Sequence, residues 1–512
     1  DEIPSDILKR ARLPGLLESV KAVHEPPKDA DLGAMNRMAT PWQRRLIFGE
    51  FFMLEAGLAV LRRGKAAESG NSFKPVEGGL VDRLARALPF KLTRAQDRVL
   101  KDIFDDMAGA SPMNRLLQGD VGSGKTIVAL MAMLRAVENG HQAVLMAPTE
   151  ILAAQHYITL HKMVEELGVE IVLLTSASKD GLEDIAGGAA MIAVGTHALI
   201  QKGVEFKRLG MVVVDEQHRF GVMQRAELKK KAHNPDILIM TATPIPRTLS
   251  LTLYGDLDYS VIDELPPGRL PVATTRHMPD EKPRVYEGIR EEVGSGGQVY
   301  VVYPLIEETE NSDLKSAVIG REALVRMYPD VRVEMVHGRM SAQDKEEVMP
   351  GFKAGVIDIL VSTTVIEVGV DVPNASLMVI VNSERFGLAQ LHQLRGRVGR
   401  GRRASRCMLL VGGPTGEDAS RRLEIMCETG DGFRVAEVDL EIRGPGEFLG
   451  TKQSGMPDLK VANIMRDAAV LDMARREAFA LVDREPEMEG HPEFRKELER
   501  FWRGKVELFG TG

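Results

Sequence analysis

The sequence predicts an α/β protein with two tandem parallel-sheet domains, an N-terminal helical segment and a mostly helical C-terminal tail. Between residue 90 and about residue 265, short apolar runs alternate with helical stretches, and a second series of the same kind ends near residue 411. This alternation is typical of βαβ units, whose parallel sheet is covered by helices on both faces. The 512 residues suffice for about three to five domains.

Composition excludes several classes of protein. Lys and Arg number 66 against 74 Asp and Glu, a formal net charge of -8, so any site for a polyanion must be local. The two cysteines, Cys407 and Cys427, form no CxxC pattern, which argues against a zinc ribbon or a disulfide framework and favours a reduced, cytoplasmic setting. No apolar run approaches the ~18 residues needed to cross a bilayer, so we expect no membrane partner.

The first part of the chain predicts helices. Apolar residues recur at steps of three and four from Trp42 to Arg63, and Gly64 ends the pattern, which predicts one amphipathic helix with a packing role. Residues 65–79 are small, polar and Gly-rich, as in a linker. The chain begins at Asp1 without the basic-then-apolar order of a secretory signal, and we expect it to be a piece of a longer chain.

A turn-rich segment separates the two sheet-forming series. The stretch DELPPGRLP, from Asp263 to Pro271, contains three prolines and a glycine and interrupts the βα rhythm. After Gly412 the sequence changes to charged helical stretches around a Gly-rich loop. The predicted division is a helical segment and linker over residues 1–85, a first sheet domain over 86–268, a second over 269–411 and a helical tail over 412–512.

One segment matches the phosphate-binding pattern GxxxxGK[ST], lies after an apolar run and opens a helical stretch. It consists of Gly119, Asp120, Val121, Gly122, Ser123, Gly124, Lys125 and Thr126. Glycines let backbone N–H groups surround a phosphate, and the helix N-terminus adds partial positive charge. In such loops the lysine reaches the β- and γ-phosphates and the hydroxyl ligates Mg²⁺.

A second acidic element follows about ninety residues later. The apolar run MVVV delivers Asp215 and Glu216 at its carboxyl end, the edge at which open α/β sheets bind ligands. This resembles a Walker B strand, in which Asp215 would hold Mg²⁺ and Glu216 would orient and deprotonate the attacking water. An acidic pair at a strand end can also be a solvated turn, but the preceding phosphate loop favours a nucleoside triphosphate hydrolase.

The second series ends in a basic segment. Residues 395–406 read RGRVGRGRRASR, with six arginines in twelve positions. Arginines stabilise the charge that builds on a transferring γ-phosphoryl group, and arginines from a second domain would couple hydrolysis to domain closure. A solvated or RNA-binding basic run is the alternative.

Read together, the motifs GDVGSGKT, APTEILAAQH, GTHAL, DEQH, TATPIPRTL, HGRM, STTVIEVGVDVPNA and QLHQLRGRVGRG occur in the order of superfamily 2 helicase motifs. Residues 85–411 thus resemble the paired RecA-like domains of that superfamily. The segments DEQHRFGVMQR, DELPPGR and ERFGLAQLHQLRGRVGRG resemble the RecG family closely and the transcription-repair coupling factor almost as well. The tail AEVDLEIRGPGEFLGTKQSG resembles the RecG C-terminus with its translocation motif, and IPSDILKRARLPGLLESVKAVHEPP resembles the segment before the RecG motor.

The resemblance implies that ATP and Mg²⁺ are the ligands, and it assigns further nucleotide contacts. Gln96 would read the adenine edge, and Phe90 would pack near the base unless it is an ordinary core residue. The remaining implied residues are Gln393 as a γ-phosphate sensor, Arg397 and Arg400 as arginine fingers, and Gly369 and Asp371 for ribose and metal-bound water.

The resemblance also implies DNA contacts, made through backbone amides and hydroxyls on phosphates, which would give no sequence preference. The implied DNA-contacting residues are Pro148, Thr149, Glu150, Gly195, Thr196 and His197 in the first domain, and Thr363 and Thr364 in the second. Those implied to couple the nucleotide to DNA are Thr241, Thr243 and His218, with a structural role as the alternative for His218. Arg443 and Gln453 lie in the loop that the family uses as a lever on duplex DNA.

The activity implied is that of an ATP-dependent translocase or helicase on double-stranded and branched DNA, reversing replication forks and migrating Holliday junctions in recombination and repair. The family expectation is a monomer in the bacterial cytoplasm at the nucleoid, with a single-strand DNA-binding protein as a candidate partner. Nothing before residue 85 offers the five short strands of the N-terminal wedge that RecG proteins carry. The rival functions are a coupling translocase that pushes RNA polymerase and a nucleotide-gated, non-hydrolysing DNA-binding scaffold.

Overall fold

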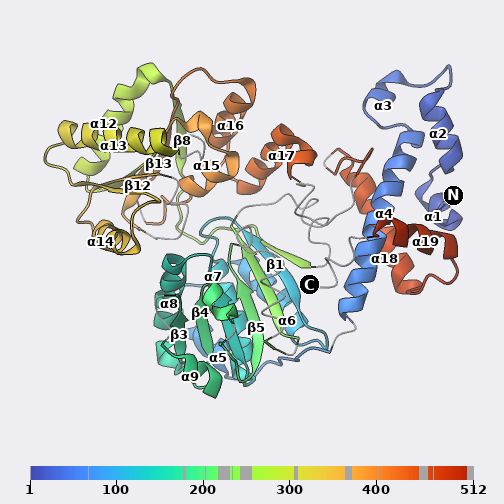
Figure 1. Cartoon of the computed structure of the whole chain (residues 1–512), viewed down its shortest axis with the longest axis horizontal. Helices are drawn as coiled ribbons and strands as arrows, with labels where there is room; N and C mark the ends of the chain where they lie inside the picture. The colour runs from blue at the N-terminus through green and yellow to red at the C-terminus, as the bar shows by residue number, and fades with distance from the viewer. Residues whose placement is uncertain are drawn as a thin grey trace.

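The structure is a computed structural model of the 512-residue chain (Figure 1). It describes residues 2–66, 69–176, 180–201, 203–216, 231–232, 234–242, 257–304, 310–363, 372–401, 403–448, 459–464 and 466–503. Two parallel sheets form the centres of two domains, and helices from both ends of the chain pack together as a separate bundle.

The first sheet has the strand order β3-β4-β2-β5-β6-β1-β7, and all its pairings are parallel. Its strands are β1 (Asn114–Gly119), β2 (Gln142–Met146), β3 (Ile171–Leu174), β4 (Ile192–Gly195), β5 (Leu209–Val214), β6 (Asp236–Thr241) and β7 (Asp258–Ile262). The accompanying helices are α5 (Leu80–Ala87), α6 (Arg94–Met107), α7 (Lys125–Glu138), α8 (Glu150–Val164) and α9 (Leu182–Gly187). Every residue of β2, β4, β5 and β6 is buried, because helices cover both faces of a parallel sheet.

The second sheet has the order β10-β11-β9-β12-β13-β8 and is also parallel in all its pairings. Its strands are β8 (Ala273–His277), β9 (Gln298–Val302), β10 (Val333–Val336), β11 (Ile359–Ser362), β12 (Ala375–Val381) and β13 (Arg406–Leu410). Its helices are α12 (Lys282–Gly294), α13 (Glu310–Met327), α14 (Ala342–Lys353) and α15 (Leu388–Arg395). The two sheets confirm the predicted α/β class with paired RecA-like domains.

The helical bundle joins the two ends of the chain. Its N-terminal members are α1 (Ser5–Ala11), α2 (Leu16–His24), α3 (Leu32–Asn36) and α4 (Pro41–Ala66), and α4 contains the helix predicted from Trp42 to Arg63. Its C-terminal members are α18 (Ala468–Arg484) and α19 (Pro492–Phe501). The indole of Trp502 donates to the carbonyl of Met53 at 3.1 Å and covers Gly57, where an added Cβ would lie 2.0 Å from the ring nitrogen.

The remaining tail helices pack mainly on the second sheet domain. Helices α16 (Glu417–Glu428) and α17 (Gly432–Phe448) contribute Leu423, Met426 and Val435 to the core of that domain. Leu440 of α17 belongs instead to the core of the bundle. The segment after residue 412 therefore divides between two cores, one shared with the second sheet and one shared with α4. Over the described ranges, no helix combines the length and apolar character required to cross a membrane.

Candidate active site

The predicted phosphate loop joins β1 to α7 as a strand, a tight loop and a helix. Gly122 and Gly124 adopt positive φ angles of 77° and 86°, which glycine tolerates because it has no Cβ. Gly124 is the N-cap of α7, so the loop ends at the positive end of a helix dipole. The local shape is that of an anion-binding site, as the pattern predicts.

Lys125 lies at the centre of this loop. Its Nζ donates to the carbonyl oxygens of Gly119 at 2.7 Å and Asp120 at 3.0 Å, and the side chain is buried. Burial lowers the pKa of Lys125, and the nearby charges of Asp215 and Glu216 oppose that effect. The charges of Asp215 and Glu216 thus act on the ammonium group of Lys125.

The acidic pair follows β5. The amide of Asp215 donates to the carbonyl of Met146 at 2.9 Å, which continues the strand pairing into the site. Glu216 has a φ of 52°, in the left-handed region that non-glycine residues rarely occupy and that often marks functional positions. The structure places both carboxylates near Lys125.

A histidine that the sequence reasoning assigned no role touches this pair. His156 Nε2 lies 2.8 Å from Asp215 Oδ2, and both side chains are buried. Burial alone would raise the pKa of Asp215, but the hydrogen bond and charge of His156 and the charge of Lys125 outweigh it and lower the pKa.

Oxygen donors suited to Mg²⁺ lie in the same region. In the part of the chain that the structure describes, no three His, Cys, Asp or Glu side chains form a metal cage. Mg²⁺ commonly takes one or two protein ligands and completes its shell with water and phosphate oxygens. Asp215 lies close enough to Lys125, the neighbour of Thr126, for the two charges to shift each other's pKa. Thr126 and Asp215 therefore fit such a site.

Gln96, near the start of α6, contacts the phosphate loop, and Phe90 precedes the same helix in sequence. Gln96 Oε1 accepts from the amide of Thr93 at 2.9 Å in a capping box, while Nε2 donates to the carbonyl of Ser123 at 2.8 Å. The buried carboxamide thus ties the start of α6 to the phosphate loop, and its predicted adenine contact stays a prediction. Phe90 is 46% exposed beside an open pocket of about 740 Å³, which disfavours the core alternative.

The second sheet domain presents its arginine segment to the loop. Arg400 lines a cleft of about 650 Å³ together with Gly122 and Arg269, and its charge helps to lower the pKa of Lys125. Gln393 and Arg397 are partly buried on or just after α15. Loop residues of both sheet domains and residues of the connecting segment therefore line one cleft.

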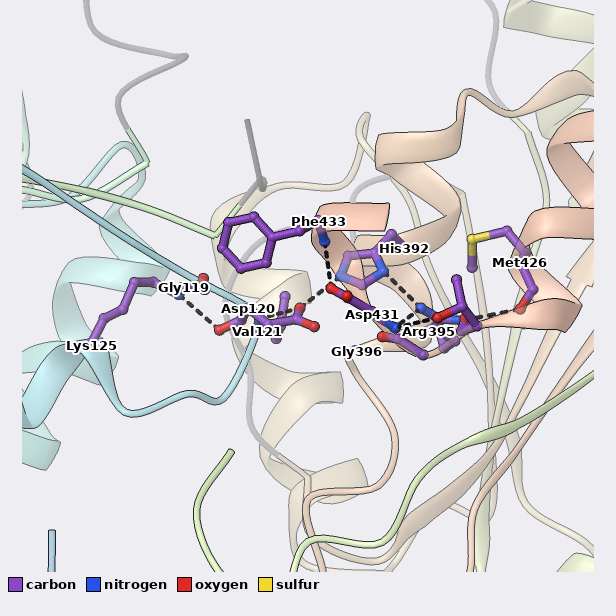
Figure 2. Close-up of polar contacts among 12 residues, drawn as sticks. Gly119, Asp120, Val121, Lys125, His392, Arg395, Gly396, Met426, Asp431 and Phe433 are labelled. Carbon is purple, nitrogen blue, oxygen red and sulfur yellow. Dashed lines mark hydrogen bonds and ion pairs between the residues drawn. The ribbon is translucent and has the colours of Figure 1, made fainter. Parts of the chain in front are cut away.

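A hydrogen-bonded path leads from the phosphate loop into the second domain (Figure 2). Asp120 Oδ1 lies 2.6 Å from His392 Nε2, and His392 Nδ1 lies 2.8 Å from Arg395 Nη2. Arg395 donates in turn to three backbone carbonyls, one in the last turn of α16 and two in the turn between α16 and α17. These belong to Met426 at 3.0 Å, Thr429 at 2.6 Å and Gly430 at 3.1 Å.

The arginine segment and the phosphate loop also pack closely against each other beside this hydrogen-bonded path. A Cβ added at Gly396 would lie 2.8 Å from Val121 Cβ, so only glycine allows the arginine segment to approach the phosphate loop this closely. Arg269 donates from the other side to the carbonyl of Val121. The loop is held by the second domain and by the segment that connects the domains.

Two predicted DNA-contact segments lie at one edge of the first sheet. Met146 of β2 pairs with Gly195 of β4, so the residues following these two strands emerge side by side. Thr149 caps α8 by accepting from the amide of Leu152 at 3.3 Å. The predicted residues at this edge are Pro148, Thr149 and Glu150, which are partly exposed, Gly195 and Thr196, which are buried, and His197, which is exposed.

Other predicted residues are buried or lie outside the described residues. Thr241 ends β6 opposite Gln118 of β1, and Thr363 follows β11; both are buried. The predicted residues outside the described residues are His218, Thr243, Thr364, Gly369, Asp371 and Gln453, and for Arg443 only the backbone, within α17, is described.

The roles of His156, His392 and Arg395 were missed. A signal existed for His156, which shares the buried face of α8 with Ala153 and Leu160, because a polar residue on an apolar face requires a partner. Arg395 opens the basic segment yet is buried, and Arg406 pairs with Glu292 at 3.3 Å. These two arginines are structural and do not belong to a solvated basic run.

Comparisons with known families divide the chain into three matched parts. Residues 93–252 match the DEAD/DEAH box helicase model, and residues 282–402 match the helicase conserved C-terminal domain. Residues 429–507 match the model described as ATP-dependent DNA helicase RecG, domain 3, C-terminal. The third match favours RecG over the coupling factor as the relative of the tail.

Curated relatives match over almost the whole chain. The ATP-dependent DNA helicase RecG of Synechocystis sp. is 47% identical over 97% of this chain and 60% of its own length. The RecG of Aquifex aeolicus is 45% identical over 99% of this chain and 65% of its own length. The RecG of Haemophilus influenzae is 45% identical over 97% of this chain and 72% of its own length. The chain thus spans less than two thirds of the first two relatives.

Comparison with solved structures also finds a similar RecG protein. A structure of RecG bound to a three-way DNA junction is 43% identical, with a TM-score of 0.71, and the match covers 92% of this chain and 61% of that one. The Dbp5 of S. cerevisiae, bound to RNA and ADP BeF3, is 19% identical with a TM-score of 0.53 over 71% of this chain and 96% of its own, a likeness of fold alone. On the identity and coverage of its relatives, the chain belongs to the RecG family.

Proposed function

We propose that this chain is the motor portion of an ATP-dependent double-stranded DNA translocase or helicase that acts on branched DNA. The observation that carries the proposal is the 2.6 Å contact between Asp120 in the phosphate loop and His392 beside the arginine segment. It joins the nucleotide loop of one domain to the segment that supplies the arginines of the other. Hydrolysis of ATP at a contact between the two domains can change the positions of the domains on DNA.

Residues of both domains share the chemistry in this proposal. Lys125 and the loop amides bind the β- and γ-phosphates of ATP. Glu216 orients the attacking water and takes its proton. Asp215 and Thr126 hold Mg²⁺, which supplies charge neutralisation on the phosphates when bound. Arg400 stabilises the charge that builds on the γ-phosphoryl group.

The remaining nucleotide roles follow from the family resemblance. Arg397 acts beside Arg400 as a second arginine finger, and Gln393 senses the γ-phosphate. Phe90 and Gln96 lie at the base, and Gly369 and Asp371 approach the ribose and the metal-bound water. The exposure of Phe90 beside an open pocket supports its part of this assignment.

DNA would bind along the edge where β2 and β4 end, through the segments 148–150 and 195–197, with residues 363–364 of the second domain on the same strand. Thr241, Thr243 and His218 would carry the nucleotide state to this surface. Arg443 and Gln453 would act as a lever on the duplex. The path from Asp120 through His392 to Arg395 supports this, because it ends on the turn before α17, which contains Arg443.

Branched DNA is the proposed substrate because the most similar solved structure described above is a RecG bound to a three-way junction. Fork reversal and Holliday junction migration in recombination and repair are the corresponding reactions. The bacterial relatives support a cytoplasmic, nucleoid-associated setting, and we propose a monomer with a single-strand DNA-binding protein as a candidate partner.

The test is steady-state ATP hydrolysis with no DNA, linear duplex, single strand or a synthetic fork, at two salt concentrations because phosphate contacts are salt-sensitive. We expect duplex and fork DNA to raise turnover, and the effect to weaken at the higher salt concentration. Turnover that no DNA raises would contradict the proposal and favour a partner other than DNA, as for the polymerase-pushing translocase.

A further inference from the structure

Helix α8 connects two regions that the proposed function treats separately. At its start, Thr149 and Glu150 lie at the sheet edge proposed to meet DNA. Two turns later, His156 reaches the carboxylate of Asp215, with 2.8 Å between Nε2 and Oδ2. One rigid element thus spans from the DNA edge to the acidic residue that follows β5.

The local sequence explains why His156 points inward. The buried side chains of α8 are Ala153, His156, Leu160 and Val164, which recur at steps of three and four on one face. A histidine among apolar neighbours must find a hydrogen-bond partner, since a buried unpaired polar group costs about 1–3 kcal/mol. Asp215 is that partner, and its own carboxylate is buried as well.

The contact restricts how the carboxylate can turn. Asp215 Oδ1 accepts from the amide of Glu216 at 3.1 Å, while Oδ2 faces His156. With both oxygens engaged, rotation of the carboxylate would break one hydrogen bond. Each carboxylate oxygen has two lone pairs, so Asp215 retains capacity for a metal while its orientation is held.

The start of α8 is itself held in place. The hydroxyl of Thr149 accepts from the amide of Leu152 at 3.3 Å, and Glu150 Oε1 accepts from the amide of Ser176 at 2.9 Å. A ligand that shifts the first turn of α8 would therefore also shift His156, because a helix moves as one body over two turns.

We propose that His156 is a positioning residue that couples DNA binding at the start of α8 to the orientation of Asp215, and thereby to the binding of Mg-nucleotide. The inference rests on the proposed function, in which Asp215 is the metal-binding carboxylate. Coupling between two ligands is reciprocal, so His156 makes DNA and Mg-nucleotide raise each other's affinity by one common factor.

The test measures this factor directly. A fluorescent ATP analogue that is not hydrolysed is titrated into the protein at saturating and at limiting Mg²⁺, with and without duplex DNA. The ratio of the two dissociation constants, without and with DNA, is the coupling factor, and we expect about fivefold or more for the unmodified chain. The half-saturating Mg²⁺ concentration is taken from the same titrations.

Three variants separate the hydrogen bond from packing. His156→Phe keeps an aromatic side chain but removes the hydrogen-bond donor, and we expect a coupling factor near one and a several-fold higher half-saturating Mg²⁺ concentration. His156→Gln retains an amide donor and should restore most of the coupling. His161→Ala, an exposed position on the same helix, is the matched control and should behave as the unmodified chain.

The inference is overturned if His156→Phe keeps the full coupling factor, or if His156→Gln loses as much as His156→Phe. In both cases the proposed function stands as long as DNA still stimulates ATP hydrolysis by the unmodified chain. If the unmodified chain shows neither DNA-stimulated hydrolysis nor coupling, the proposed function fails together with the inference.

Discussion

Asp120 in the phosphate loop and His392 in the second domain lie 2.6 Å apart, although 272 residues separate them in sequence. Burial would raise the pKa of Asp120, but the hydrogen bond and charge of His392 outweigh it and lower the pKa. The contact makes the shape of the nucleotide loop depend on the position of the second domain.

Breaking this contact should weaken the association of the two domains. In a double-mutant cycle with Asp120→Asn and His392→Phe, we expect the two changes to be non-additive by about 0.5–3 kcal/mol in the free energy of unfolding, as for residues in direct contact. His392→Gln, which keeps a donor, should lose less than His392→Phe. A coupling energy near zero, measured by urea unfolding, would show that the contact does not hold the domains.

Glu216→Gln should separate binding from chemistry. The amide cannot accept the proton of the attacking water, so turnover should fall by about 10²- to 10⁴-fold while the affinity for ATP stays within a few-fold of normal. The measurement is single-turnover hydrolysis beside equilibrium binding of ATP. An equal loss of both would assign Glu216, with its φ of 52°, a structural role.

Arg443→Ala should uncouple hydrolysis from movement along DNA. Because the backbone of Arg443 lies in α17, beyond the turn that Arg395 anchors, we expect the change to leave the nucleotide cleft intact. We expect DNA-stimulated ATP hydrolysis near the normal rate and loss of strand displacement on a forked substrate. Parallel loss of both activities would place Arg443 in the nucleotide machinery instead.

Asp236 predicts a pH dependence of stability. It is fully buried at the start of β6, where Oδ1 accepts from the amide of Met113 at 2.8 Å, and burial raises its pKa to about 8 from 3.8. The folded state thus favours the protonated carboxyl. Its contribution to stability is fully present below pH 3.8 and is lost as the pH rises through about 8.

Asp236→Asn removes this titration and keeps an acceptor for Met113. The difference between the unfolding free energy of the variant and that of the unmodified chain should therefore increase as the pH rises. The increase is at most about 1.4 kcal/mol per pH unit between the two pKa values. Urea unfolding of both proteins at pH 5 and pH 8 checks this. The same difference at both pH values would mean that the carboxyl of Asp236 does not titrate with folding.

Contiguous patterns predicted much of the fold and the centre of the site. The strand ending at Gly119, the glycine loop and the helix beginning at Lys125 follow one another in sequence, so local signals sufficed. The helix containing Trp42 was likewise visible from its apolar spacing. Its partner α18 was not, because these two helices meet from opposite ends of the chain and periodicity carries no information about pairing.

The roles that the sequence did not predict belong to residues whose contact partners lie far away in the sequence. Nothing local distinguishes Arg395 from its neighbours in the basic segment, yet Arg395 is buried on backbone carbonyls and Arg400 lines the cleft. The partner of His156 likewise follows from the order of β2 and β5 in the sheet, which sequence periodicity does not determine. Residues that join domains or layers become apparent only once the chain is folded.

The central claim is that one active site is assembled from both sheet domains, and Arg400→Ala tests it most directly. Arg400 belongs to the second domain, so its loss should leave ATP binding by the first domain nearly intact. The measurement is DNA-stimulated turnover with saturating ATP, and we expect a fall of about 10³-fold or more, as for removal of an arginine finger. Turnover at the normal rate would contradict the account, because the first domain alone would then suffice for hydrolysis.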